Sequence, residues 1–217
     1  MSLPIIVVGA GGHAAVVVDA LLEAGAKVLG FTDPDLHLHG TQRIGLPVLG
    51  SDDEVLGQFA PDRVSLANGL GFVNGSGQRS LRAVVQLRLE ARGWQFVSVI
   101  HPLAHVSSRA KLGASCQILA GAHVQAGASV GTGTIVNTGA IVEHDSIVGH
   151  WCHLATRSTL CGHCRVGDGS LVGAGAVLRQ GVAIGKNTVV GAGAVLVRDS
   201  AGEETLCGVP ARPLGTK

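Results

Sequence analysis

The hydrophobic residues of the second half of the chain follow a strict six-residue spacing. An aliphatic residue stands at every sixth position from Ile100 to Leu196, and a small residue follows each of them four positions later, from Ala104 to Ser200. A unit with one inward aliphatic position and one small position suits one side of a triangular solenoid, so that three units make a coil of eighteen residues. An ordinary all-β domain would instead show alternation with a period of two and irregular spacing. The pattern predicts a parallel β-helix over residues 100–217.

The first residues of the chain have a different pattern. An apolar run at residues 5–8 leads into the glycine-rich stretch at residues 9–13, and an apolar helical stretch follows over residues 14–24. A second strand at residues 27–32 ends before Asp33. The glycines fit the spacing of nucleotide-binding loops, in which backbone N–H groups at a helix start hold a phosphate group. We therefore expect Gly11 and Gly12 to take part in nucleotide binding.

Four further elements complete a small Rossmann-like α/β domain with a parallel sheet over residues 1–99. They are a helix capped by Ser51 and Glu54, a strand at residues 63–67, a helix with an apolar stripe of Leu81, Val84, Val85 and Leu89, and a strand at residues 95–100. A full dinucleotide fold needs more chain than this, so the domain favours a mononucleotide or a nucleotide sugar over NAD.

Composition narrows the choice of partners. The 217 residues carry a formal net charge of only +1, which gives no sign of a nucleic-acid partner. The N-terminus lacks a basic leader and Asp19 interrupts the apolar run behind it, so we expect a cytoplasmic protein without a membrane segment. The five cysteines are an odd number, which favours free thiols over a disulfide framework.

The repeat itself singles out His144 as a candidate for chemistry. His144 lies two residues beyond the inward Val142, so its side chain should face outward. Its neighbours one coil away, Ala126 and Gly162, are small and leave room for a ligand. A histidine near its ordinary pKa suits a general base, which is one of the few groups that acetyl transfer to an amine requires.

Four segments of the chain resemble a known family. They are GAGGH at 9–13, IHPLAHVSS at 100–108, NTGAIVEHD at 137–145 and GVPAR at 208–212. They resemble the hexapeptide-repeat acyltransferases, and among them those that acetylate nucleotide-activated amino sugars, including the bacillosamine and perosamine N-acetyltransferases and their sialic acid O-acetyltransferase relatives. The resemblance implies a left-handed β-helix, a homotrimer with active sites between subunits, and acetyl-CoA as the acetyl donor.

The same resemblance assigns roles to individual residues. It implies that His144 is the base and that Asp145 orients it, with Glu143 as a competing candidate for that orientation. It places Asn137 at the sugar or its amine, and His13 in the sugar-nucleotide site, where Asp33 would contact the base or ribose. The implied contacts to acetyl-CoA are His153, Gly162 and Arg212.

Metal chemistry and a purely structural role are the alternatives. The stretches at residues 150–153 and 161–164 are rich in zinc-ligand types, but Cys152 and Cys164 fall on the small inward position of the repeat. A β-helix carbonic anhydrase would need three histidines, and only His105 and His123 stack one coil apart. A non-enzymatic scaffold or ice-binding solenoid would show outward threonine columns, whereas the outward positions here are mixed.

We therefore expect no metal and a two-domain, homotrimeric N-acetyltransferase. Its expected substrate is a 4-amino-4,6-dideoxy sugar linked to UDP or GDP, with acetylation of a sugar hydroxyl as the nearest alternative.

Overall fold

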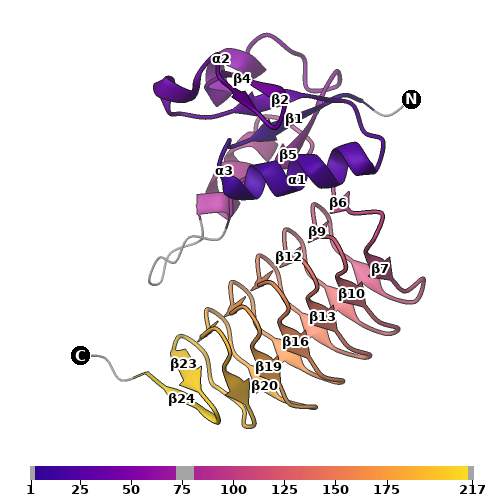
Figure 1. The fold of residues 1–217 in the computed structure, drawn as a ribbon, viewed down its shortest axis with the longest axis vertical. Coiled ribbons are helices and arrows are strands. Elements are labelled where there is room, and N and C mark those ends of the chain that lie inside the picture. Colours follow the sequence, from indigo (N-terminus) through magenta and orange to yellow (C-terminus); the bar gives the residue numbers. More distant parts are fainter. Residues whose placement is uncertain (1–2, 72–80, 215–217) are drawn as a thin grey trace. The chain divides into compact units, whose positions relative to one another are not determined.

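The computed structural model describes residues 3–71 and 81–214, which form two compact units (Figure 1). The first unit ends at Pro102 and the second begins at Leu103. The sequence predicted a boundary between residues 99 and 100.

The first unit is built on a five-stranded sheet with strand order β3-β4-β2-β1-β5. The strands are β1 (Ile5–Val8), β2 (Val28–Thr32), β3 (Gln42–Arg43), β4 (Leu46–Gly50) and β5 (Ser65–Asn68), and the helices are α1 (Gly12–Glu23), the 3-10 helix η1 (Leu36–Leu38), α2 (Asp52–Leu56) and α3 (Leu81–Glu90). β1, β2, β4 and β5 run parallel, as predicted for three of them, but β3 pairs with β4 in antiparallel fashion. The sheet is therefore mixed, because a short hairpin that the hydrophobic pattern did not reveal forms its edge.

Helices cover both faces of this sheet. On one face, Ile6, Val8 and Leu66 form a buried cluster with residues of α2, α3 and the following turn, namely Val55, Leu56, Leu89 and Trp94. On the other face, α1 approaches so closely that a Cβ added at Gly69 would lie 2.7 Å from both Ala14 Cβ and Val7 Cγ1. Gly69 therefore permits close packing of helix on strand, as glycines do in nucleotide-binding α/β folds.

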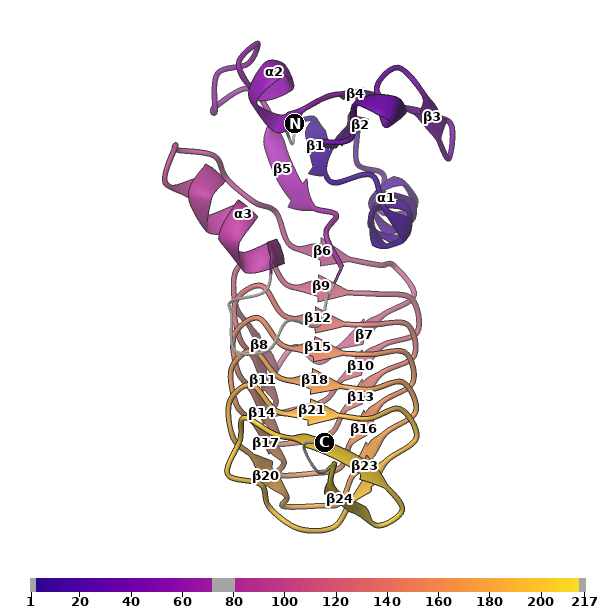
Figure 2. The same cartoon turned by 90° about the vertical axis from the view of Figure 1, so that its left-hand side faces the viewer.

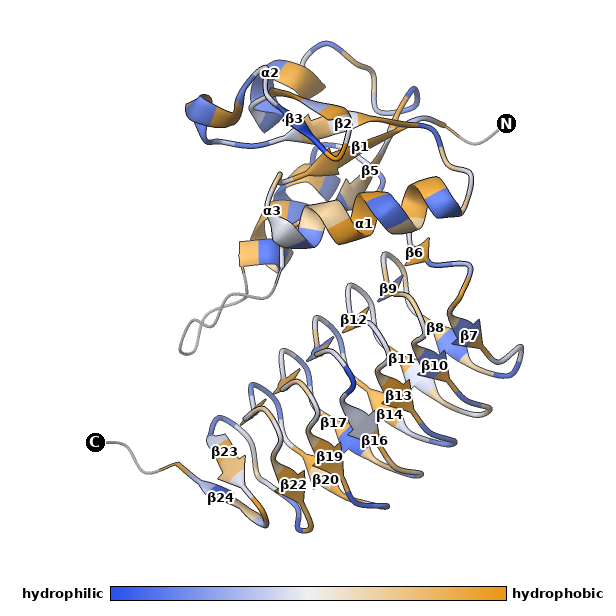
Figure 3. Ribbon diagram, in the orientation of Figure 1, coloured by the Kyte–Doolittle hydropathy of each residue, from blue (hydrophilic) through white to orange (hydrophobic). Residues whose placement is uncertain are grey.

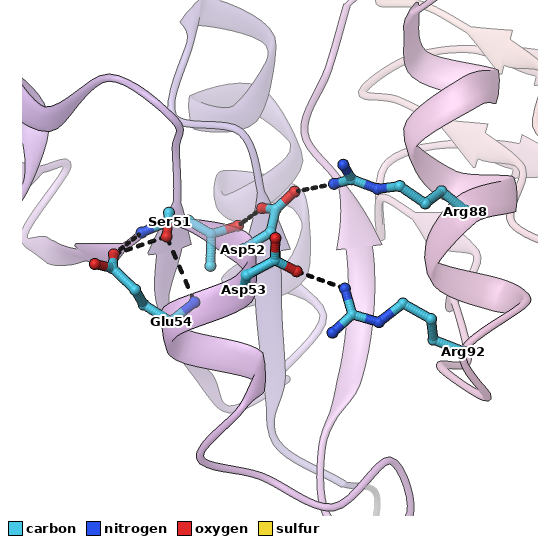
Figure 4. Close-up of polar contacts among 7 residues, drawn as sticks. Ser51, Asp52, Asp53, Glu54, Arg88 and Arg92 are labelled. Carbon is cyan, nitrogen blue, oxygen red and sulfur yellow. Dashed lines mark hydrogen bonds and ion pairs between the residues drawn. The ribbon is translucent and has the colours of Figure 1, made fainter.

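The predicted cap of α2 is confirmed, and charged residues of this helix reach toward α3 (Figure 4). The Ser51 side chain accepts a hydrogen bond from the Glu54 N–H, while a Glu54 carboxylate oxygen accepts one from the Ser51 N–H. Arg88 Nη2 lies 3.1 Å from Asp52 Oδ2, and Arg92 Nη1 lies 2.5 Å from Asp53 Oδ1. Hydrogen bonding to Arg92 lowers the pKa of Asp53.

Helix α3 forms as predicted, and Val85 and Leu89 of the predicted apolar stripe pack into the core, whereas Leu81 and Val84 do not. Leu81 and Val84 are 57% and 48% exposed, whereas Arg82, Ala83, Gln86 and Leu89 are buried. Polar contacts explain which face of α3 is buried. The Asn68 amide at the end of β5 donates hydrogen bonds to Gln86 Oε1 and to the Arg82 carbonyl, each at 3.0 Å. Hydrogen bonds from the strand end thus select the buried face of the helix.

The predicted strand at residues 95–100 is much shorter in the structure. Only β6 (Val99–Ile100) is a strand, although Phe96 forms an isolated bridge to Leu66. Val99 is buried and Ile100 is 43% exposed, so the inward series does not begin at Ile100 as predicted.

The second unit consists of stacked parallel sheets, the arrangement typical of a left-handed β-helix (Figure 2). One sheet holds β7 (His105–Val106), β10 (His123–Val124), β13 (Ile141–Val142), β16 (Thr159–Leu160), β19 (Val177–Leu178) and β22 (Val195–Leu196). The next holds β8 (Lys111–Leu112), β11 (Ser129–Val130), β14 (Ile147–Val148), β17 (Arg165–Val166) and β20 (Ala183–Ile184). The third includes β9 (Gln117–Ile118), β12 (Ile135–Val136), β15 (His153–Leu154), β18 (Leu171–Val172) and β21 (Val189–Val190), followed by the terminal hairpin β23 (Thr205–Gly208) and β24 (Ala211–Pro213).

The interior of these coils follows the predicted repeat. From Cys116 to Leu196 the aliphatic and small positions form one buried cluster, with the polar small residues buried among them. Figure 3 shows that the hydropathy of the strands also changes along the stack: β7 and β8, in the first coil, carry polar residues, while β19, β20 and β22 are hydrophobic. A thin core of this kind depends on close registry between coils.

Polar residues at the small inward position join one coil to the next. The Thr134, Ser146 and Ser170 hydroxyls each donate to the carbonyl fifteen residues later, at 2.8 to 3.1 Å, and each accepts the N–H eighteen residues later. The thiols of Cys116, Cys152 and Cys164 donate in the same way at 3.1 to 3.2 Å. Burial raises the pKa of Cys152 to about 12, so this cysteine is a protonated inward filler.

Two serines at this inward position provide a test of the hydroxyl contacts. We expect Ser170→Ala to lower the free energy of unfolding by about 1–3 kcal/mol, because it leaves the buried Thr188 N–H without its acceptor. Ser158→Ala should change it little or raise it, because the buried Ser158 hydroxyl has no hydrogen-bond partner within the described part of the chain. Chemical denaturation of both variants measures the difference, and equal losses would contradict the assignment.

Candidate active site

The second unit presents an exposed histidine–aspartate pair at the corner that follows β13. His144 Nδ1 lies 2.9 Å from Asp145 Oδ2, and each side chain is about half exposed. The hydrogen bond from His144 holds the pKa of Asp145 below its usual value, so the carboxylate is ionised and Nδ1 acts as the donor. A neutral imidazole has one N–H, so donation from Nδ1 leaves Nε2 as the acceptor nitrogen. This geometry favours Asp145 over Glu143 as the orienting residue, since Glu143 accepts only from the backbone N–H of His144.

Glycines on the neighbouring coils fit closely around this pair. A Cβ added at Gly162 would lie 2.5 Å from His144 Nε2, and one added at Gly127 would collide with Asp145 Oδ1. Gly162 is therefore placed beside the imidazole, as its position in the repeat predicts. The Asp145 backbone has a φ of +58°, a left-handed conformation that turns the side chain outward at a position where Gly127 stands one coil earlier.

The structure adds His163, a residue that the sequence suggested only as part of a discarded zinc cluster. The His163 and His144 rings meet edge to face with centroids 5.1 Å apart, and His163 Nε2 lies 3.8 Å from Asp145 Oδ2. His163 follows Asp145 by eighteen residues, so counting whole coils would have revealed the contact. Like Asp145, it adopts a left-handed conformation, with φ of +61°.

Asn137 and His153 meet each other, on a different corner from His144. Asn137 Nδ2 lies 3.0 Å from His153 Nε2, and Asn137 Oδ1 accepts the N–H of Thr138 at 2.7 Å. Asn137 follows β12 and His144 follows β13, so one coil carries the two at successive corners. The predicted sugar contact and one predicted acetyl-CoA contact therefore form a single pair.

In the first unit, the predicted nucleotide loop lies at the carboxyl ends of β1 and β2. Gly11 and Gly12 are exposed at the start of α1, and an added Cβ at either would meet nothing within 4 Å. His13 stands, half-buried, in the first turn, as predicted. Asp33 Oδ2 accepts the Ala10 N–H at 2.8 Å, so this carboxylate holds the glycine loop against the end of β2.

The terminal hairpin places Arg212 opposite Cys207. Arg212 also lines a hollow of about 180 Å³ between β22 and the hairpin, together with Leu196, Arg198 and Glu204. A larger hollow of about 570 Å³ runs along β14, β17 and β20 and is lined by Arg165, Asp168 and Asp199, but none of the predicted site residues lines it.

The carbonic anhydrase alternative lacks its third histidine. His105 and His123 pair in register with ring centroids 5.7 Å apart, but the next residue in that column is Ile141. Of the helices that the structure describes, none has the length and apolar character needed to cross a membrane.

Comparison with known proteins assigns this arrangement to a class. Residues 4–74 match the family model of the PglD N-terminal domain, and residues 163–198 match that of the bacterial transferase hexapeptide, six repeats. No curated protein matches the chain. The coils, the outward histidine and these matches together define a hexapeptide-repeat acyltransferase.

Solved structures narrow the class further. The acetyltransferase domain of PglB from Neisseria gonorrhoeae is 32% identical with a TM-score of 0.88, over 98% of this chain and 100% of that one. PerB from Caulobacter crescentus, solved in complex with CoA and GDP-perosamine, is 34% identical with a TM-score of 0.86, over 98% and 97% of the two chains. The chain therefore belongs to the PglD-type family of hexapeptide-repeat sugar N-acetyltransferases. The predicted fold class, family and enzyme class are thus confirmed.

The close fit of Gly162 beside His144 leads to a prediction. Gly162→Ala should displace the imidazole from Asp145, so that the pKa of Asp145 rises toward its ordinary value. A carbon-13 NMR titration of the Asp145 carboxyl group measures this shift. Gly12→Ala, whose added methyl group meets nothing within 4 Å, is the matched control and should leave the pKa of Asp145 unchanged. An unshifted pKa in Gly162→Ala would show that the ring tolerates the methyl group.

Proposed function

We propose that this protein transfers the acetyl group of acetyl-CoA to the amine of a 4-amino-4,6-dideoxy sugar linked to UDP or GDP. The observation that carries the proposal is the exposed His144 imidazole, whose Nδ1 is engaged by Asp145 and whose Nε2 is left to accept a proton. Two relatives support the choice of ligands. The Neisseria PglB domain has been solved with acetyl coenzyme A, and the Caulobacter enzyme with CoA and GDP-perosamine.

In the proposed reaction, the neutral sugar amine attacks the thioester carbonyl and forms the C–N bond. His144 Nε2 takes a proton from the attacking nitrogen, and Asp145 stabilises the resulting imidazolium. The C–S bond then breaks, and the proton passes to the departing thiolate, which gives the amide and free CoA. This sequence uses only the chain's own residues and requires no metal.

Binding is assigned to two groups of residues. The exposed backbone at Gly11 and Gly12, with His13, suits the phosphates of the nucleotide sugar, because N–H groups at a helix start attract anions. Asp33 contributes through the loop that it holds, and Asn137 is the proposed contact to the sugar. His153, Gly162 and Arg212 are assigned to acetyl-CoA, with the Arg212 guanidinium suited to a phosphate.

Replacement of the base tests the mechanism. We expect His144→Ala to lower kcat by about two to four orders of magnitude, because the attacking amine then has no positioned proton acceptor. His150→Ala is the matched control, since His150 occupies the same repeat position after β14, and it should retain the wild-type rate. A loss of less than about tenfold in His144→Ala would overturn the base assignment.

The acceptor is identified with a panel of UDP- and GDP-linked 4-amino sugars and their matched hydroxy sugars. Thiol release from acetyl-CoA should saturate with one amino sugar and stay at background with the hydroxy sugars. Saturable release with a hydroxy sugar alone would overturn N-acetylation in favour of O-acetylation.

We further infer that the protein is a homotrimer. Outward positions of the later coils carry partly exposed aliphatic residues, among them Leu171, Val177, Val189 and Val195, as expected of a surface that pairs with another subunit. Light scattering should give three times the chain mass of 21.9 kDa. Val177→Glu should lower that mass, because it would bury a charge at the interface, and a monomer mass for the wild type would contradict the inference.

A further inference from the structure

His144, Asp145 and His163 form a cluster of three metal-ligand types on two successive coils. The three side chains are each half exposed or slightly more, and one ligand atom from each lies within 4.8 Å of the others. The described residues contain no other such group of three. Two neutral imidazoles and a carboxylate are ligands that zinc and similar divalent metals prefer.

The separations suit a single bound ion. Asp145 Oδ2 lies 2.9 Å from His144 Nδ1 and 3.8 Å from His163 Nε2. Ligands bound at about 2.0–2.2 Å in a tetrahedral arrangement stand about 3.3 Å apart, so small side-chain rotations would bring all three to one ion. A fourth position stays open to solvent because all three side chains are exposed.

The stacking of successive coils places Asp145 and His163 next to each other in one column. Along the column that contains Asp145 and His163, the positions one coil before and one coil after are Gly127 and Gly181, both in left-handed conformations. Asp145 and His163 adopt this conformation without being glycine. The same left-handed turn recurs along the coils, and Ser115, Arg157 and Asn187 also occupy it without being glycine, so the conformation is a regular feature of the repeat. Asp145 and His163 are thus adjacent side chains in a column whose next members, Gly127 and Gly181, carry no side chain.

We propose that His144, Asp145 and His163 bind a divalent transition metal such as Zn²⁺, and that the bound metal inhibits acetyl transfer. The inhibitory part rests on the proposed function of His144. When the His144 ring is neutral, donation from Nδ1 to Asp145 leaves Nε2 as the acceptor. Metal at Nδ1 occupies that nitrogen's lone pair, so the single proton of the neutral ring resides on Nε2. Nε2 then donates and accepts no proton from the sugar amine.

Calorimetric titration of the untagged full chain with Zn²⁺ alone tests the site without any turnover. We expect one ion per chain in the wild type. His163→Asn and His163→Gly should each weaken binding at least about tenfold, since each removes a ligand while suiting the left-handed backbone. His150→Asn, at an exposed histidine outside the cluster, should bind as the wild type does. Equal binding by the wild type and both His163 variants, or no binding by the wild type, would overturn the site.

Acetyl transfer in the presence of Zn²⁺ tests the inhibition. Saturating Zn²⁺ should lower the wild-type rate about as much as His144→Ala does, by two to four orders of magnitude, with recovery on addition of a chelator. For His163→Asn and His163→Gly, the rate at the same Zn²⁺ concentration divided by each variant's own rate without Zn²⁺ should stay near one, whereas this ratio falls for the wild type. Full activity with the site occupied would overturn the inhibition, and an inactive protein that still binds Zn²⁺ through His163 would count against the proposed function alone.

Discussion

The backbone pairing of each coil with the next is the constraint on which the second unit depends. Strand residues pair with those eighteen positions further along, as His123 does with Ile141, so every residue has fixed neighbours above and below it. The buried hydroxyls and thiols strengthen this registry, because they bridge adjacent coils where aliphatic residues would only fill space. The same pairing fixes the geometry of the site, because Gly162 lies beside the His144 ring only when the two coils are held in this register.

Much of this unit could be predicted from the sequence because the repeat converts position into geometry. The spacing alone placed His144 outward and Gly162 beside it, and both placements hold in the structure. The choice between Asp145 and Glu143 depended on side-chain direction, because Asp145 Oδ2 meets His144 Nδ1 while Glu143 Oε2 accepts the backbone N–H of His144. His163 was missed for a different reason. In the sequence it was considered only as part of a possible zinc cluster with Cys164, and that cluster was rejected because Cys164 occupies a buried inward position.

The first unit was harder to predict because its elements choose partners that lie far apart in the sequence. Four aliphatic residues suggested the buried face of α3, yet Asn68 at the end of β5 recruits Gln86 and turns Leu81 and Val84 outward. The β3–β4 hairpin is too short for a hydrophobic period to register. The glycine loop was placed correctly at the start of α1, but the hydrogen bond from Ala10 to Asp33 fixes the loop in a way that spacing cannot show.

The number of stacked coils also sets the distance between the two ends of the proposed site. In the third sheet, five strand steps separate β12, which belongs to the coil that carries His144, from β24, which carries Arg212. At about 4.8 Å per step, β12 and β24 stand roughly 24 Å apart along the stack. Insertion or deletion of one whole coil would change that span by about 5 Å and leave every side chain at both ends in place. On the proposed assignment of Arg212 to acetyl-CoA, such a change would alter the length of ligand that spans the two ends without any substitution among the proposed contact residues.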